Sequence, residues 1–126
     1  MLTMINPKGA PVSPSYSQGA LAEAPKKMLF VSGQVGVGPD GQPGKDIGEQ
    51  TRFAIANVNA VLAEAGMDNT NLAKVTIYLT DESLLPGFMQ AAAGTLPSPP
   101  PATTLLIVKA LAAPPLLIEI EAVAVG

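Results

Sequence analysis

The 126-residue sequence contains no cysteine and no histidine. Without cysteine, the chain has neither a disulfide framework nor thiol chemistry. Without histidine, it lacks the commonest general base near neutral pH and the commonest metal ligand, so catalytic triads of the Ser-His-Asp kind are excluded. We therefore expect no metal site in this protein.

Charged residues are also scarce, because they make up 13% of the chain and Arg52 is the only arginine. This is about half the usual charged share, and a monomer of this size needs more charge to cover its surface. Two explanations stay open: a globular protein rich in alanine and valine, or a chain that buries part of its surface against other subunits. The net charge of −3 gives little support to a basic groove, so we expect no nucleic-acid partner.

Long apolar runs are missing as well. No stretch reaches the roughly 18 residues of a membrane span, and the N-terminal sequence MLTMINPKGAP has no basic region followed by an apolar core. We therefore expect a soluble, cytoplasmic protein without a membrane partner. The length corresponds to a single domain over residues 1–126, long enough to bury a core.

The clearest predicted element is a helix over Asp46–Ala65, where apolar residues recur at spacings of three and four. Asp46 and Glu49 have the spacing of an acidic capping box at its start. Gly66 stands just past its end, where a left-handed backbone favours glycine. The sequence thus marks both ends of this helix.

The remaining pattern predicts an α+β domain. A second, weaker helix is expected over Ser83–Leu96, with Pro86 in its first turn. One sheet with both helices on one face is the simplest packing. Strands are predicted at Lys27–Gly33, where both faces are apolar, at Lys74–Thr80, at Thr104–Ala110 and at Leu116–Val125, with a short strand or hairpin near the start.

Three glycines, Gly36, Gly38 and Gly41, have the G-x-G-x-x-G spacing of dinucleotide-binding turns. In such sites the third glycine opens a helix whose N-terminus holds the pyrophosphate. Here Gln42-Pro43-Gly44 follows instead, and the predicted helix begins only after Lys45. We interpret the three as turn glycines and expect no cofactor.

Six segments resemble, in order and spacing, the reactive-intermediate deaminase family, also called YjgF-like or endoribonuclease L-PSP-like. They are PSYSQG (Pro14–Gly19), LFVSGQV (Leu29–Val35), EQTRFAIANVNAVLAEAG (Glu49–Gly66), KVTIYLTD (Lys74–Asp81), PPAT (Pro100–Thr103) and IEIEAVAV (Ile118–Val125). The resemblance implies a chorismate-mutase-like fold with one mixed β-sheet and two helices packed on one face. It also implies a homotrimer with a central β-barrel and three clefts between subunits.

The resemblance also implies site residues. Active members of the family hydrolyse enamines and imines, using an arginine that holds the substrate carboxylate and a glutamate that positions or activates water. Those positions are occupied here by Thr103 and Glu119. A tyrosine and a serine that line the family's cleft match Tyr16 and Ser32, and Met89 stands where many members have an asparagine.

The missing arginine is the main departure from the family's pattern. Charge-assisted hydrogen bonds to a carboxylate are worth about 1.5–3 kcal/mol each, whereas Thr103 offers one neutral hydroxyl. The loss corresponds to about 2–5 kcal/mol of binding free energy. Lys109 lies too far along the same strand, and the sequence leaves open whether a neighbouring subunit supplies Lys26, Lys27, Lys74 or Arg52 instead.

Each candidate also has a plain structural interpretation. Tyr16 could only pack, Ser32 could cap a turn, and Thr103 could satisfy a backbone group near the proline run. Glu119 and Glu121 share one face of the last strand, so at least one of them is expected to be a solvated or paired carboxylate.

Two classes of function follow. The first is an enzyme that acts on a small reactive metabolite, such as an enamine, an imine or a related labile pathway intermediate, and that is not the standard 2-imino acid deaminase. The second is a non-catalytic trimer that binds a small ligand or a partner protein. A ribonuclease is a third alternative, for which an acidic chain without histidine has weak means of holding phosphate.

Overall fold

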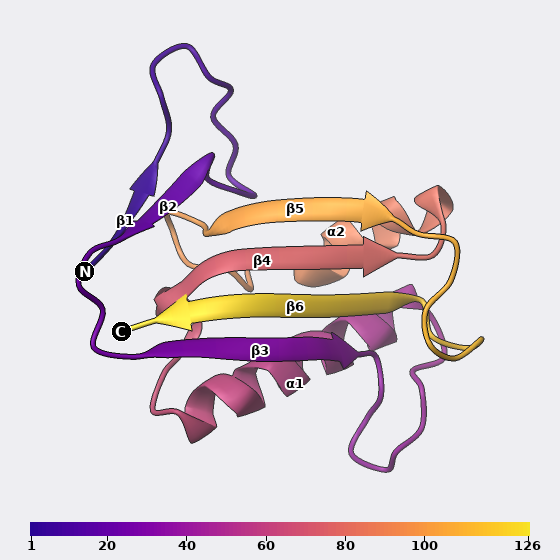
Figure 1. Cartoon of the computed structure of the whole chain (residues 1–126). Coiled ribbons are helices and arrows are strands. Elements are labelled where there is room, and N and C mark those ends of the chain that lie inside the picture. Colours follow the sequence, from indigo (N-terminus) through magenta and orange to yellow (C-terminus); the bar gives the residue numbers. More distant parts are fainter.

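The computed structural model describes all 126 residues and has a sheet layer and a helix layer (Figure 1). Two short 3-10 turns lie at Asn69–Asn71 and Glu82–Leu84. In chain order the strands and α-helices are β1 (Leu2–Ile5), β2 (Gly19–Ala22), β3 (Met28–Val35), α1 (Ile47–Glu64), β4 (Leu72–Leu79), α2 (Leu85–Ala92), β5 (Ala102–Ile107) and β6 (Ile118–Val125).

The main sheet has the strand order β3-β6-β4-β5. Strands β4 and β5 run parallel, whereas β6 runs antiparallel to both of its neighbours. Both helices lie on the same side of this sheet, and its other face carries no element of the chain (Figure 1). The predicted α+β fold, with two helices on a mixed sheet, is confirmed.

Strands β1 and β2 correct the expectation of a single sheet. They form the predicted hairpin near the start, but they pair only with each other, as a separate two-stranded sheet. The chain leaves β2 through Ala24, whose φ is +44°, and Pro25, which lacks a backbone N–H. This turn redirects the chain before β3, so the hairpin does not continue into the main sheet.

Helix α1 begins and ends as its sequence predicts. The Asp46 carboxylate accepts a 2.9 Å hydrogen bond from the Glu49 amide. The Glu49 carboxylate accepts from the amide of Lys45, one residue before the position of a standard capping box. Gly66 follows the helix with a φ of +70°, which fits its predicted role at the C-terminus.

Three predicted elements extend more than one residue beyond the observed ones. Strand β6 begins at Ile118 rather than Leu116. Helix α2 ends at Ala92 rather than Leu96, and Gly94 follows it with a φ of +76°. Pro86 lies in the first turn of α2, as predicted. Strand β5 ends at Ile107 rather than Ala110, because Ile107 pairs with Leu79, the last residue of β4. Beyond that point β5 has no partner strand.

The hydrophobic core lies between the helix layer and the sheet. Helix α1 packs on β3 and β6 and alongside α2. Neither helix is long and apolar enough to cross a lipid bilayer. The buried core side chains are Val31, Ala54, Val58, Leu62, Met67, Leu72, Val75, Ile77, Leu79, Phe88, Ile118, Ile120, Ala122 and Ala124.

The three glycines of the G-x-G-x-x-G spacing belong to a turn. The Gly41 amide donates to the Gly38 carbonyl, and Gly41 has a φ of +80°. Gly36 packs against Gln50 of α1, because a Cβ atom at Gly36 would lie 2.3 Å from that of Gln50. The turn folds back on itself before α1 begins, in agreement with the interpretation as turn glycines.

Candidate functional site: a cavity and a carboxylate cluster on opposite faces of the sheet

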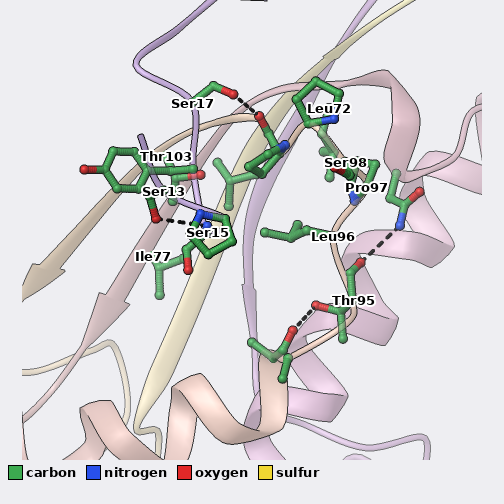
Figure 2. A pocket seen from close by; sticks show the side chains of 18 of the residues that line it. Ser13, Ser15, Ser17, Leu72, Ile77, Thr95, Leu96, Pro97, Ser98 and Thr103 are labelled. Atoms are coloured by element: carbon green, nitrogen blue, oxygen red, sulfur yellow. Dashed lines mark hydrogen bonds between the residues drawn. The ribbon is translucent and has the colours of Figure 1, made fainter. Parts of the chain in front are cut away.

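A cavity of about 870 Å³ lies on the helix-covered side of the sheet. Its walls come from the N-terminal segment 12–17, from α1 and α2, from segment 94–100 and from the sheet. Figure 2 shows Ile77 of β4 and Leu96 of the proline-rich segment among its side chains. The volume is within the range of about 300–1,000 Å³ that small-molecule sites occupy.

Ser17 joins the two proline-rich walls of this cavity. Ser17 is 2% exposed, and its hydroxyl donates a 2.5 Å hydrogen bond to the Pro100 carbonyl (Figure 2). Its amide donates to the Pro101 carbonyl at 3.0 Å, and Ser17 forms an isolated parallel bridge with Ala102. The proline run is therefore a fixed wall, because it is fastened to the N-terminal segment immediately before β5.

Three of the predicted site residues, Tyr16, Met89 and Thr103, line this cavity. The Thr103 hydroxyl donates to the Pro101 carbonyl at 3.1 Å, so its plain structural interpretation also holds. Met89 of α2 is 46% exposed. These three side chains come from three different parts of the chain, which the fold brings to one cavity.

The cavity has no charged wall. None of its lining residues is an aspartate, glutamate, lysine or arginine. In particular, none of the basic residues considered as replacements for the missing arginine (Lys26, Lys27, Lys74, Lys109 and Arg52) lines the cavity of its own chain. The Lys27 ammonium instead donates to the Ala65 carbonyl at 2.6 Å, beside the end of α1.

The other two predicted site residues do not join the first three. Thr103 pairs with Val75 of β4, whereas Glu119 pairs with Tyr78, three residues further along the same strand. Because side chains alternate along a strand, Glu119 faces the opposite side of the sheet from Thr103. Ser32 is exposed on β3. A single chain therefore does not bring all five candidates together.

On the open face, the carboxylate of Glu119 lies directly over Gly33. A Cβ atom at Gly33 would lie 1.9 Å from Glu119 Oε2 and 2.6 Å from its Cδ. The register between β3 and β6 shifts between Val31 and Gln34, so a bulge occurs at this point. Bulges are frequent beside active sites, where they redirect side chains.

A tyrosine and a second carboxylate lie beside Glu119. The Tyr78 hydroxyl donates a hydrogen bond to Glu121, which makes Glu121 the paired carboxylate that the sequence leads us to expect. This hydrogen bond raises the pKa of Tyr78 above its usual value, with smaller contributions from desolvation and from the charges of Glu121 and Glu119. The open face therefore carries carboxylates, which the lining of the cavity lacks.

Sequence reasoning missed three residues of these sites: Ser17, Gly33 and Tyr78. Ser17 lies inside the PSYSQG segment and Gly33 inside LFVSGQV, so the segments that carry the family resemblance already contained both residues. Tyr78 alternates with the buried side chains of β4, which placed it on the other face of the sheet but gave no partner for it.

Comparison with known proteins identifies the family. The family model for endoribonuclease L-PSP matches residues 8–126. The chain belongs to this family. Among solved structures, it is similar to YyfB of Yersinia pestis, from the conserved Rid protein family, with a TM-score of 0.84, 30% identity and 98% of each chain covered. Yeast Mmf1 gives a TM-score of 0.73 with 30% identity, over 99% of this chain and 98% of that one.

Curated relatives match part of the chain. A RutC family protein of Aquifex aeolicus is 43% identical over 56% of this chain and 54% of its own length. The 2-iminobutanoate/2-iminopropanoate deaminase of Rattus norvegicus is 39% identical over 53% of this chain and 48% of its own length. The matched part of the chain thus spans about half the length of these relatives.

Proposed function

We propose that this protein is a homotrimeric enzyme that acts on a small reactive metabolite, either an enamine, an imine or a related labile pathway intermediate. The reaction is water-mediated hydrolysis or acid–base chemistry, and it is not the standard 2-imino acid deamination. The observation that carries the proposal is the division of the site: a cavity without charge lies on one face of the sheet, and Glu119 lies on the other.

The open face of the sheet supports an assembly of several chains. Met28 and Phe30 of β3 are 53% and 70% exposed on it, and Leu106 of β5 is 47% exposed. Exposed apolar surface of this kind marks contact sites, and the chain has few charges with which to cover it. In the proposed trimer, the open faces form a central β-barrel, and the cavity of one subunit meets the open face of the next.

Each candidate residue then has a role in the cleft between subunits. Tyr16, Thr103 and Met89 contact the substrate in the cavity, and Ser32 contributes a hydroxyl from the neighbouring chain. In imine hydrolysis, the oxygen of water adds to the C=N carbon and the nitrogen leaves as ammonia. Glu119 accepts a proton from that water and passes it to the nitrogen, which gives a carbinolamine. Glu119 then transfers the hydroxyl proton of the carbinolamine to the same nitrogen, as the C=O bond forms and the C–N bond breaks.

The assembly is tested by its mass in solution. We expect sedimentation or light scattering to give three times the chain mass of 12.8 kDa. A mass equal to one chain contradicts the proposal, because one chain holds Glu119 and Thr103 on opposite faces.

The reaction is tested by ammonia release from two substrates. We expect the protein to hydrolyse an uncharged imine, such as benzophenone imine, faster than freshly generated 2-aminoacrylate. Glu119→Gln removes this activity, whereas the matched variant Glu121→Gln, on the same face of β6, retains most of it. Rapid turnover of 2-aminoacrylate that Glu119→Gln abolishes contradicts the substrate assignment. No turnover of either substrate favours the non-catalytic binding trimer.

A further inference from the structure

Three hydroxyl groups in the lining of the cavity have already donated their hydrogens within the chain. Ser17 donates to the Pro100 carbonyl at 2.5 Å and Thr95 to the Ala92 carbonyl at 2.6 Å (Figure 2). Thr103 donates to the Pro101 carbonyl at 3.1 Å. A hydroxyl has one hydrogen and two acceptor lone pairs. These three side chains can therefore only accept a hydrogen bond from a bound molecule.

The proline run removes further donors from the same lining. Between Pro97 and Pro101 every residue except Ser98 is a proline, and proline has no backbone N–H. Pro97, Pro99 and Pro100 all line the cavity. This part of the wall offers carbonyl oxygens and apolar rings but almost no amide hydrogens.

The donors that remain in the lining are all neutral. They are the hydroxyls of Ser13, Ser15, Tyr16 and Ser98 and the side-chain amides of Asn6, Asn59 and Asn69, of which Asn69 already donates to the Thr95 carbonyl. Tyr16 makes no side-chain hydrogen bond within the chain, so its hydroxyl is free to donate. Ser15 and Ser98 are exposed. No lysine or arginine lines the cavity. A carboxylate only accepts hydrogen bonds. It therefore finds no cation anywhere in the cavity, and it finds acceptors rather than donors at Ser17, Thr95 and Thr103.

The rest of the lining is suited to contact with an apolar ring or chain of a bound molecule. Ile77, Phe88 and Leu105 line the cavity from β4, α2 and β5, and half of the lining residues are hydrophobic. From these observations we infer that the cavity binds uncharged molecules that combine an apolar ring or chain with a hydrogen-bond donor, and that it rejects carboxylates. This inference rests on the proposed function only in taking the cavity as the substrate site.

Three probes of nearly the same size and shape test this selection. Benzamide is uncharged and donates, acetophenone is uncharged and only accepts, and benzoate is an anion that only accepts. In an NMR titration of the full-length protein, we expect benzamide to bind most tightly, acetophenone less tightly, and benzoate about tenfold more weakly than benzamide or worse. The methyl signals of Ile77 and Leu105 should move, whereas that of Val123, on the open face, should not.

A positive charge placed in the cavity should strengthen benzoate binding relative to benzamide binding. Thr103→Arg supplies a cation and two aligned donors, so we expect the ratio of benzoate to benzamide affinity to rise about tenfold or more. Gln90→Arg is the matched control, because it adds the same charge at an exposed position of α2 that does not line the cavity. That variant should leave the order of the three probes unchanged.

Several results would overturn the inference. One is that benzoate binds the unmodified protein as tightly as benzamide does. Another is that the ratio of benzoate to benzamide affinity rises equally in Thr103→Arg and Gln90→Arg. Failure of all three probes to move the cavity signals would show that another part of the assembled protein fills the space. The titration needs no turnover: a protein that ranks the probes as expected but hydrolyses no imine contradicts the proposed function and leaves this inference standing.

Discussion

The two faces of the main sheet differ in their chemistry. The helix-covered face holds the hydrophobic core and a cavity whose lining carries no charge. The open face holds Glu119, Glu121 and Tyr78 in one cluster, with the Lys74 ammonium bonded to Thr104 nearby in the sheet. The uncharged cavity and the carboxylate cluster thus lie on opposite sides of the same strands.

This division follows from the two-residue period of a strand. Neighbouring residues of β4, such as Ile77 and Tyr78, necessarily serve different faces. A substitution should therefore act on folding or on the candidate chemistry according to the face it occupies. Four substitutions test that rule, in order of decreasing effect.

Leu62→Ala should have the largest effect on folding. Leu62 of α1 is fully buried in the core, and truncating such a side chain leaves a cavity that costs about 3–5 kcal/mol. Chemical denaturation at a fixed protein concentration measures the loss. Phe30→Ala removes a larger side chain from the open face, where Phe30 is 70% exposed. At a low protein concentration, where the chains are separate, we expect Phe30→Ala to lower the free energy of unfolding less than Leu62→Ala. An equal loss in the two variants would contradict the rule that the effect on folding depends on the face.

Gln50→Leu tests the hydrogen bonds that join the Gln50 side chain of α1 to the backbone of neighbouring segments. The Gln50 amide donates to the carbonyls of Gly44 and Pro115 and accepts from the Leu117 amide, with all three hydrogen bonds between 2.8 and 3.0 Å. Leucine has a similar size but leaves these backbone groups without partners, which should cost about 2–4 kcal/mol. Gln90→Leu, at an exposed position of α2, serves as the control. Equal stability of the two variants would contradict the assigned role.

The main elements of the fold followed from the sequence, because they depend on local patterns. Asp46, Glu49 and Gly66 mark the ends of α1 through chemistry within one turn of the helix. The ends of α2 and β5 did not follow, because β5 stops where its partner strand stops, at Leu79. That limit comes from a segment more than twenty residues away in the chain.

The candidate site followed only in part. A match to family positions named Thr103 and Glu119, but the faces they occupy depend on the register of β4 with β5 and β6. Ser17 and Gly33 were missed because their roles come from contacts with distant residues, a carbonyl of the proline run and the carboxylate of Glu119. Tyr78 was missed for the same reason, since its partner Glu121 lies on another strand.

Gly33→Ala should change the open face without unfolding the protein. The new Cβ would overlap the carboxylate of Glu119, which is the far end of a flexible side chain and can move aside. We expect a stability change below about 1 kcal/mol and at least a tenfold loss of the activity that depends on Glu119. The measurements are denaturation and the ammonia-release assay. Gly19→Ala, whose Cβ would meet nothing closer than 4.0 Å, is the control, and full activity of Gly33→Ala would refute the importance of this placement.

Tyr78 allows the smallest and most local test of the open face. The hydrogen bond to Glu121 raises the pKa of Tyr78, so the folded protein holds this proton more tightly than the unfolded chain, whose tyrosine pKa is about 10. The resulting stabilisation is present below that pH and is lost as the pH rises through the folded pKa.

The chain has two tyrosines and no tryptophan, so ultraviolet titration of a Tyr16→Phe background reports Tyr78 alone. In this background we expect a titration midpoint above 10, and Glu121→Gln should lower it, because the acceptor carboxylate and its charge are removed. Glu23→Gln, an exposed carboxylate outside the main sheet, should leave the midpoint unchanged. Equal midpoints of Tyr78 in the Glu121→Gln and Glu23→Gln variants would mean that Tyr78 is not coupled to the carboxylate of Glu121. The two faces of the sheet would then differ in the positions of their residues but not in this acid–base coupling.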